Sequence, residues 1–389
     1  MTNPDDQSVD SSNKVAVLHI VDSLDFGGTQ TILKSLFEAQ TENRHIFLLA
    51  LRETPRKVSI DHPNIYVYPS ISRFSLWPIG SILELIKTHR IQILHCHLFR
   101  SEIFGYLASR LLRGHTIKLV FHDHGSAIAM ENGSRFERFA FCFFHYLAAP
   151  RVDLHINISQ FVQQSLMALT FQRMRKSVVL YNPIRDMLCP EQMQPEHRTR
   201  LKESWRIPQG SFILGIASRI VHRKGWRDFL AAVSILAEEF PLFFLVAGDG
   251  PELACLQAEI VSKKLTKHGR GLGYVENLAD FYSVLDCFVM PSLWEPTGLA
   301  HLEAQYNSVP VVACNIPGLN ETVQDEINCL LCRPNDPQDM ADKIRQLITR
   351  HDLRDRIGRA GQENARHFAI ESYIQQLEAL YSPLVANSL

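Results

Sequence analysis

The feature that most constrains this chain is a regular alternation of short apolar runs with amphipathic stretches of helical length. The N-terminal half contains the runs KVAVLHIV, RHIFLLAL, IYVY, IQILHCH, IKLVFH, DLHINI and SVVLY. Nearly continuous apolar runs of this length are typical of parallel strands buried on both faces. Amphipathic stretches separate most of them, at 32–40, 79–90, 101–113 and 160–170. The pattern therefore predicts an α/β fold with a doubly wound parallel sheet.

The same alternation occurs twice. It lapses after Asn182 into a stretch rich in proline and charge, and restarts at FILGIAS, followed by LFFLVAG, GRGLGYV, DCFVM, VPVVAC and NCLLC. A chain of 389 residues that is 46% hydrophobic can bury two cores. We predict two Rossmann-like domains that face a cleft. The expected organisation is a disordered start at 1–13, a first domain at 14–185, a linker at 186–208, a second domain at 209–368, and a helix at 369–389 that packs back on the first domain.

Charge and hydropathy exclude several classes of protein. Lys and Arg number 40 against 41 Asp and Glu, whereas domains held to nucleic acid by phosphate attraction are usually strongly basic. No apolar run approaches the roughly 18 residues that cross a bilayer, and the polar start has no apolar signal-peptide core. We expect no nucleic-acid partner and a cytoplasmic protein, or one peripheral at the inner face of the membrane.

The segment PSLWEPTGLAHLEA carries two carboxylates, Glu295 and Glu303, eight positions apart. Glu295 follows an apolar run, and Glu303 is predicted on the second turn of a helix that begins near Gly298 with Thr297 as its cap. The start of such a helix offers unpaired N–H groups to a phosphate. The spacing predicts that the two acids contact different parts of one ligand. The alternative is a solvated acidic helix end.

Two further loops follow predicted strands. The segment SRIVHRKG places Arg219 and Lys224 after a buried strand, where two cations fit a diphosphate; a solvated basic loop is the alternative. The segment DFGGTQ places Gly27 and Gly28 where backbone N–H groups can approach an anion or a sugar. It lacks the third glycine of the dinucleotide fingerprint and the ending of a nucleoside-triphosphate loop, which argues against hydride transfer and triphosphate hydrolysis.

Four histidines occur in two close pairs, His95 with His97 and His122 with His124, each pair at the end of a predicted strand. Strand alternation points His95 and His97 to one face, but the sequence identifies no third ligand and no Asp-x-Asp tripeptide, so we predict no metal. His124 precedes Gly125 in a loop and is interpreted as a hydrogen-bonding or proton-handling group near a reacting sugar. A structural histidine is the alternative.

The segment RFERFAFCFFHYLAAPR, residues 135–151, mixes arginines with aromatic residues. Its spacing favours a helix buried against the sheet. The other interpretation is a contact with a membrane surface or a lipid acceptor, through side chains that include Arg135, Phe136, Arg138 and Phe139.

With these motifs assembled, the chain resembles the retaining glycosyltransferases of the large GT-B family four from residue 14 to about residue 385. The resemblance is most specific in SRIVHRKG, AGDGPE, PSLWEPTGLAHLEA, PVVACNIPGLNETV and NCLLCRPND. It implies that Arg219 and Lys224 bind the donor diphosphate, that Glu303 bonds the ribose hydroxyls, and that Glu295 contacts the donor sugar. It also implies donor contacts at Gly28, His124, Gly298 and Leu299, and we expect the backbone around Gly273 and Tyr274 to contact the base.

We therefore expect a metal-independent retaining glycosyltransferase, of the hexosyltransferase type, that uses a nucleotide-diphosphate sugar and no cofactor. The expected acceptor is a glycan or a lipid-linked acceptor in cell-surface polysaccharide or glycolipid synthesis. Two alternatives stay open: an epimerase or phosphorylase of the same fold, and a non-catalytic nucleotide-sugar-binding protein. Paired carboxylates alone also leave glycoside hydrolysis open.

Overall fold

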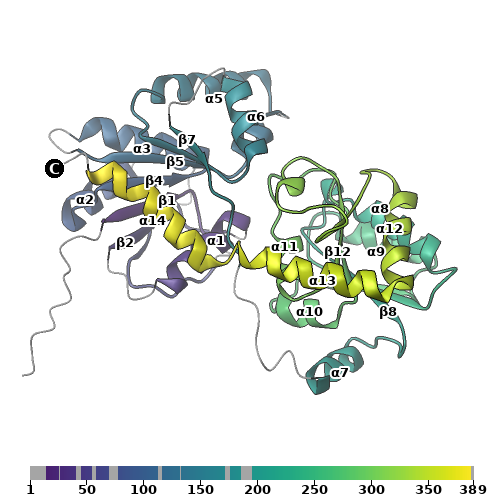
Figure 1. The fold of residues 1–389 in the computed structure, drawn as a ribbon. Helices are drawn as coiled ribbons and strands as arrows, with labels where there is room; N and C mark the ends of the chain where they lie inside the picture. Colours follow the sequence, from purple (N-terminus) through teal and green to yellow (C-terminus); the bar gives the residue numbers. More distant parts are fainter. Residues whose placement is uncertain are drawn as a thin grey trace, which may run out of the picture. The chain divides into compact units, whose positions relative to one another are not determined.

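The structure is a computed structural model that describes residues 15–25, 27–40, 45–54, 58–69, 78–112, 116–131, 133–170, 176–184 and 195–386. The predicted disordered start at 1–13 lies outside these residues. The chain divides into two compact units (Figure 1). The first comprises Met1–Leu180 with Tyr373–Leu389, and the second comprises Tyr181–Ser372.

The first unit contains a parallel sheet of seven strands in the order β3-β2-β1-β4-β5-β6-β7. Each of the seven N-terminal apolar runs contains one strand, because strands covered on both faces need apolar side chains throughout. The strands are β1 (Val17–Val21), β2 (Ile46–Ala50), β3 (Ile65–Val67), β4 (Ile93–His97), β5 (Lys118–Asp123), β6 (Leu154–Asn157) and β7 (Ser177–Val179).

Helices cover this sheet, and the two faces of its central strands differ in chemistry. The helices are α1 (Gly28–Ala39), α2 (Pro78–His89), α3 (Phe99–Leu111), α4 (Ser126–Glu131), α5 (Arg135–Ala148) and α6 (Gln160–Thr170). Leu18 and Ile20 of β1 point to one face, where they share an apolar core with Ile82 of α2 and Phe104 of α3. Because side chains alternate along a strand, His19 lies on the other face.

The second unit has a parallel sheet of six strands in the order β10-β9-β8-β11-β12-β13. Its strands are β8 (Phe212–Ala217), β9 (Leu242–Ala247), β10 (Gly269–Gly273), β11 (Cys287–Met290), β12 (Val311–Cys314) and β13 (Leu330–Cys332). Its helices are α7 (Pro195–Ser204), α8 (Trp226–Leu236), α9 (Leu253–Ser262), α10 (Leu278–Val284), α11 (Ala300–Tyr306), α12 (Pro337–Thr349) and α13 (His351–Arg366). Two sheets of the predicted class are thus confirmed.

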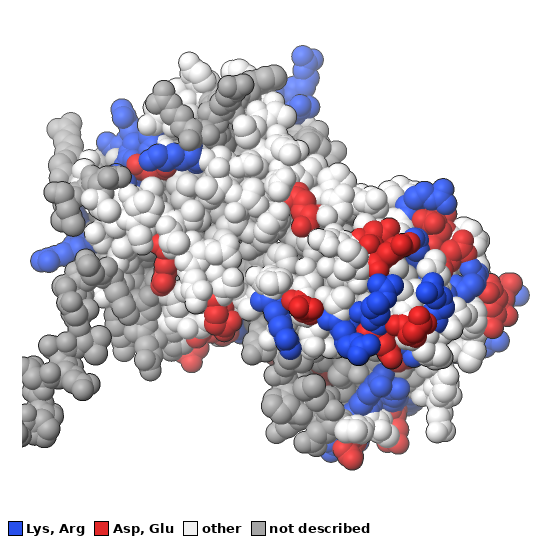
Figure 2. All heavy atoms as spheres, in the orientation of Figure 1, with Lys and Arg blue, Asp and Glu red and all other residues white. Residues whose placement is uncertain are grey.

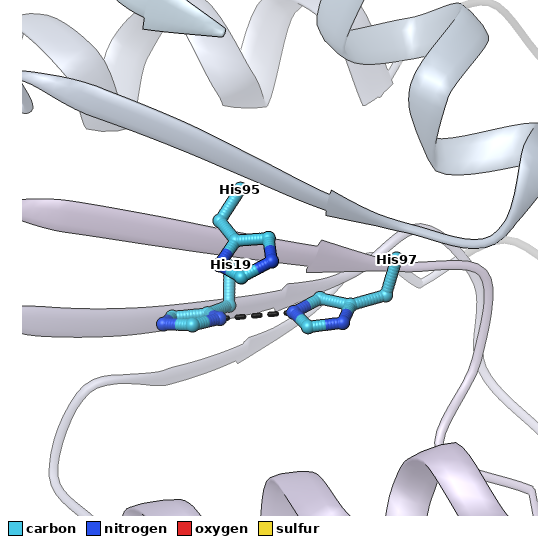
Figure 3. A group of neighbouring side chains, drawn as sticks. All are labelled: His19, His95 and His97. Carbon is cyan, nitrogen blue, oxygen red and sulfur yellow. Dashed lines mark hydrogen bonds between the residues drawn. The ribbon is translucent and has the colours of Figure 1, made fainter. Parts of the chain in front are cut away.

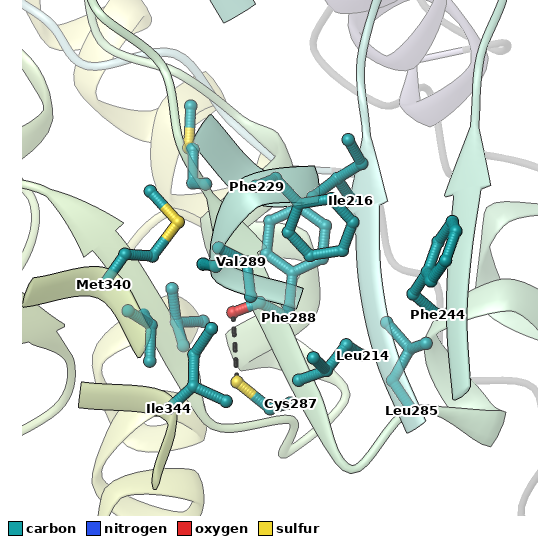
Figure 4. Close-up of a cluster of buried hydrophobic side chains, with 14 of the residues drawn as sticks. Leu214, Ile216, Phe229, Phe244, Leu285, Cys287, Phe288, Val289, Met340 and Ile344 are labelled. Carbon is teal, nitrogen blue, oxygen red and sulfur yellow. Dashed lines mark hydrogen bonds between the residues drawn. The ribbon is translucent and has the colours of Figure 1, made fainter. Parts of the chain in front are cut away.

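The core of the second unit packs large apolar side chains from α8 and α12 against the strands (Figure 4). Phe229 of α8, Phe288 of β11 and Ile344 of α12 are all fully buried there. Part of the predicted linker also belongs to this unit, since α7 lies within 186–208 and packs beside α10. His197 of α7 has its Nε2 atom 2.8 Å from Oδ1 of Asp280 in α10.

The last helix, α14 (Ile370–Ala386), returns to the first unit, as predicted. Within that unit it covers the histidine-bearing face of the sheet, where the Tyr381 hydroxyl lies 2.5 Å from Nδ1 of His95 (Figure 1). Across the described stretches, no helix has both the length and the apolar character that a membrane span requires.

Candidate functional site

The basic loop and the acidic loop of the second unit meet at the point where its strand order reverses. From β8 the chain proceeds through β9 to β10 on one side, and β11 lies on the other side of β8. Loops that follow such neighbouring strands diverge and leave a crevice at the carboxyl edge of the sheet, where α/β proteins bind ligands. Lys224, in a short 3₁₀ turn at His222–Lys224, follows β8, and Glu295 follows β11.

Close backbone packing fixes these two loops to each other. Gly225 has a positive φ of 66°, and a Cβ atom placed on it would lie 1.7 Å from the carbonyl oxygen of Pro291. The Leu293 N–H donates to the Arg223 carbonyl at 2.8 Å, and the Arg223 guanidinium lies 4.8 Å from the ring centroid of Trp294. Only glycine tolerates this approach, so the sequence Lys-Gly sets the position of the lysine.

Lys224 and Glu295 form an ion pair across this contact, through Nζ and Oε1. Their side chains are 17% and 5% exposed. The Ser292 hydroxyl donates to the same carboxylate oxygen at 2.9 Å, so two donors hold Glu295. An ammonium group has three donors, which leaves Lys224 able to bind a phosphate oxygen while it remains paired with Glu295.

Arg219 lies on the same loop, and its backbone is held while its side chain is exposed. The next residue, Ile220, donates its N–H to the Asp249 carbonyl at 2.9 Å, and Gly248 and Gly250 allow the loop after β9 to pack directly on this backbone. The Arg219 guanidinium forms no hydrogen bond or ion pair with the residues that the structure describes. It is therefore available to an anionic ligand.

The start of α11 differs from the prediction. Thr297 is not its cap, because Gly298 adopts a positive φ of 81° and Leu299 occupies the N-cap position instead. The helix begins at Ala300, which places Glu303 in its first turn and not in its second. Thr297 is 1% exposed, so its side chain is buried within the loop. Leu299 is the N-cap, and Gly298 precedes it, outside the helix.

A buried tyrosine orients Glu303. The Tyr282 hydroxyl donates to Oε2 of Glu303 at 2.9 Å and lies 3.2 Å from the Ala300 carbonyl. Burial, together with the Glu303 carboxylate, raises the pKa of Tyr282 well above its ordinary value, so the phenol stays protonated and donates. Tyr274 lies after Gly273 at the carboxyl end of β10, on the same edge of the sheet, and is 66% exposed.

In the first unit the two glycines lie where β1 passes into α1. Gly27 is the N-cap and Gly28 opens the helix, and a Cβ atom on Gly28 would meet nothing within 4 Å. The side chain of Gln30 is buried and donates from Nε2 to the Ser23 carbonyl at 3.0 Å. Gln30 thus holds the loop from inside, while the backbone of Gly28 stays open to a ligand.

His124 follows β5, and Gly125 beside it has a positive φ of 103°. The N–H of Gly125 donates to Oδ1 of Asp123 at 2.9 Å, which shapes this loop. The Nε2 atom of His124 lies 3.1 Å from Nδ1 of His97. Packing around the ring lowers the pKa of His124 to about 3, so the imidazole is neutral at neutral pH and acts as a hydrogen-bonding group.

Helix α5 contradicts the favoured prediction of burial against the sheet. Phe136, Phe139 and Tyr146 are 78%, 65% and 69% exposed, and Phe143 and Leu147 are exposed beside them. The spacing of these five positions puts them on one helical face. On the other side Phe141, His145 and Ala148 are buried. The helix therefore packs by one narrow side and presents an aromatic face, with Arg135 and Arg138 near its start.

Three residues that the sequence did not single out complete these arrangements: Ser292 beside Glu295, Tyr282 beside Glu303, and His19 beside His97. Ser292 lies within the acidic motif, and its spacing of three from Glu295 is a usable signal. Tyr282 is 21 positions before Glu303, and His19 is 78 positions before His97. Only the order of the strands and the helix packing bring these partners together.

Two family models together match most of the chain. Glycosyltransferase Family 4 matches residues 26–186, and Glycosyl transferases group 1 matches residues 197–364. The chain belongs to the glycosyltransferase family that these two models, family 4 and group 1, describe. The second match contains the loops of Arg219, Lys224, Glu295 and Glu303, and the first contains Gly28 and His124.

Relatives of known name share this sequence at modest identity. The chain is 23% identical to N-acetyl-alpha-D-glucosaminyl L-malate synthase of Bacillus anthracis, over 91% of this chain and 93% of that protein. It is 32% identical to 2-deoxystreptamine glucosyltransferase of Streptomyces kanamyceticus over 42% of this chain and 44% of that protein, so this match spans less than half of either.

Among solved structures, the fold matches Anabaena HepE in complex with UDP and glucose. The TM-score is 0.78 at 19% identity, and the match covers 95% of this chain and 100% of the other. At this identity the likeness establishes the fold, which is GT-B.

Proposed function

We propose that this glycosyltransferase transfers a sugar with retention of configuration from a nucleoside-diphosphate sugar, and that its second unit holds the donor. The observation that carries the proposal is the contact between the loops after β8 and β11. There Lys224 pairs with Glu295 at the switch point of the sheet, and the exposed Arg219 lies five positions before Lys224 on the same loop. Two cationic side chains at the carboxyl ends of the strands are suited to bind a diphosphate.

Each donor group has a proposed partner in this unit. Arg219 and Lys224 bind the diphosphate and stabilise the charge that develops as the nucleotide leaves. Glu303, oriented by the Tyr282 hydroxyl, accepts hydrogen bonds from the ribose. The N–H groups at Gly298 and Leu299 face the phosphates, and Gly273 and Tyr274 contact the base. Because two cations serve the leaving group, we propose that catalysis needs no divalent metal.

Glu295 is assigned to the donor sugar as an electrostatic and hydrogen-bonding group. Its carboxylate already accepts from Lys224 and Ser292, which lowers its electron density for attack on a sugar carbon. His124 of the first unit, neutral by its lowered pKa, is assigned to hydrogen bonding with the same sugar, and Gly27 and Gly28 to a backbone contact with the substrate. We propose retention of configuration at the anomeric carbon on the basis of the family resemblance. This outcome does not require a covalent intermediate between the sugar and Glu295.

The test measures product and not binding alone. The purified chain is incubated with UDP-, ADP- and GDP-sugars in the presence and absence of an acceptor panel. Acceptor-dependent release of nucleoside diphosphate, with the anomeric configuration of the donor kept in the product by NMR, supports the proposal. Isomerised donor or sugar phosphate would identify the epimerase or phosphorylase, and tight donor binding without turnover would identify a binding protein.

We further propose that the acceptor is a lipid-linked glycan of cell-surface polysaccharide or glycolipid synthesis, met at the cytoplasmic face of a membrane. The support is the aromatic face of α5, since aromatic rings favour the membrane interface and arginines near the helix start attract anionic headgroups. In the view of Figure 2, charged side chains of both signs are dense on the second unit and sparser on the described part of the first.

Sedimentation with vesicles tests this surface. Wild-type protein should bind vesicles that contain anionic lipid, and the Phe136→Ser, Phe139→Ser double variant should lose at least 90% of that binding at unchanged stability, because both rings are exposed. Val261, 64% exposed on α9, supplies the matched control Val261→Ser. Equal binding by the double variant and the wild type would refute membrane docking through α5.

A further inference from the structure

A layer of imidazole rings lies on the face of the first sheet opposite its apolar core. His19 of β1 and His95 of β4 are register partners in adjacent strands, and His97 follows two positions later on the same face (Figure 3). All three side chains are at most 1% exposed. One nitrogen from each lies within 4.8 Å of the other two, and Nδ1 of His19 lies 3.0 Å from Nε2 of His97.

These separations fit the coordination of a metal ion. Zinc bound by three imidazoles at about 2.0–2.1 Å in tetrahedral geometry sets nitrogen atoms about 3.3 Å apart. The His19 to His97 separation of 3.0 Å is close to this value, and a nitrogen of His95 lies within 4.8 Å of both. A neutral imidazole ring offers one nitrogen lone pair to a metal.

Hydrogen bonds among the described residues do not satisfy every nitrogen in this layer of rings. His122 of β5 is the register partner of His97, and its Nδ1 atom lies 3.1 Å from Nε2 of His95. The Nε2 atom of His122 and the Nδ1 atom of His124 are buried, yet neither has a partner within the described part of the chain. Buried polar atoms are normally satisfied, so the described hydrogen bonds do not complete this layer; the two unpartnered nitrogens belong to His122 and His124 and lie outside the three rings considered as ligands.

A tyrosine and a cavity lie beside the three rings. The Tyr381 hydroxyl of α14 lies 2.5 Å from Nδ1 of His95 and fixes its ring, as partners of metal-bound histidines do. His19, Tyr381 and Glu378 line one cavity of about 260 Å³ beneath α14. Of the three rings, His19 borders this cavity, and Glu378 contributes an acidic side chain to the same lining.

We propose that His19, His95 and His97 bind a divalent transition-metal ion of the zinc class, which links β1 to β4 beneath α14. Imidazole-only ligands favour zinc over magnesium or calcium, which prefer oxygen. The proposed ion serves the structure of the first unit. It stands apart from the donor chemistry assigned to Arg219 and Lys224, so the two proposals can fail separately.

The test is the metal content of the full chain, purified with any affinity tag removed. We expect about one zinc ion per chain by inductively coupled plasma mass spectrometry. Metal-free protein, prepared with a chelator, should bind Zn²⁺ again in competition with a chromophoric chelator and should gain several degrees in its unfolding midpoint. Cobalt in its place should give the absorption of a four-coordinate site.

The variants separate this site from adventitious binding. His97→Gln should weaken Zn²⁺ binding at least a hundredfold. His155→Gln is the matched control and should bind as the wild type does, because His155 is buried in β6 as the register partner of Phe121, on the opposite face of the same sheet. Full zinc retention in His97→Gln overturns the proposal. So does wild-type protein that neither contains zinc nor changes its unfolding midpoint with Zn²⁺, a result that would leave a metal-free layer of hydrogen-bonded imidazoles.

Discussion

Replacing Gly225 with alanine should separate the two loops on which donor binding depends. Gly225 has a φ of 66°, a conformation that a residue with a Cβ atom adopts at a cost of about 1–2 kcal/mol. Its new Cβ atom would also lie 1.7 Å from the Pro291 carbonyl oxygen, whereas real contacts stay above 3.0 Å. The loops must therefore move apart by at least 1.3 Å, the difference between the two distances.

Comparison with a Gly210→Ala variant separates the effect of this steric clash from the effect of backbone strain. It has a φ of 78°, and a Cβ atom there would meet nothing within 4 Å, so Gly210→Ala carries the backbone strain alone. Overpacking against a rigid neighbour costs about 1–3 kcal/mol, which is the expected excess loss of stability in Gly225→Ala over Gly210→Ala. Because the movement draws Lys224 away from Glu295, affinity for a nucleoside diphosphate should fall as well.

Urea unfolding and isothermal titration of both variants check these values. Gly225→Ala should unfold at a clearly lower urea concentration than Gly210→Ala and bind nucleoside diphosphate about tenfold or more weakly. Equal stability of the two variants, with unchanged affinity in Gly225→Ala, would refute the inference that the Gly225 contact sets the site.

Two more predictions concern single side chains, Tyr282 and His301. Tyr282→Phe removes the donor that orients Glu303, so we expect the donor KM to rise about tenfold with little change in kcat, and an unchanged KM would remove the proposed role of Glu303 at the ribose. Burial lowers the pKa of His301 from 6.5 to about 3, so below pH 6.5 the unfolded chain binds a proton that the folded chain does not, and stability falls by up to about 1.4 kcal/mol per pH unit. His301→Gln should reduce the loss between pH 7 and pH 5 in urea unfolding; a loss as steep as in the wild type would contradict the buried neutral ring.

The sequence was most informative about the strands. Every apolar run in both halves contains a strand, because a parallel sheet covered on both faces needs apolar residues at consecutive positions. Helix starts were less predictable. Thr297 has the right residue type for a cap, but the left-handed Gly298 moves the N-cap to Leu299, and a local pattern does not reveal that backbone conformation.

Contacts between segments that are far apart in the chain could not be predicted from the sequence. His95 and His97 were recognisable as neighbours on one face, but His19 joins them only because β1 pairs with β4. The periodicity of α5 revealed two faces without showing that the aromatic one stays uncovered. The loops of Arg219, Lys224 and Glu295 were predictable because each follows a strand, and parallel strands end at one edge.

Affinity of Arg219→Ala for a nucleoside diphosphate tests the central proposal most directly. The Arg219 side chain is exposed and makes no hydrogen bond within the described residues, so its removal should leave the free energy of unfolding unchanged. Loss of a charge-assisted bond of about 1.5–3 kcal/mol should weaken binding about ten- to a hundredfold, while affinity for the nucleoside alone stays as it was. Unchanged affinity for the diphosphate in a folded Arg219→Ala protein would contradict the proposal that the loop after β8 binds the leaving group.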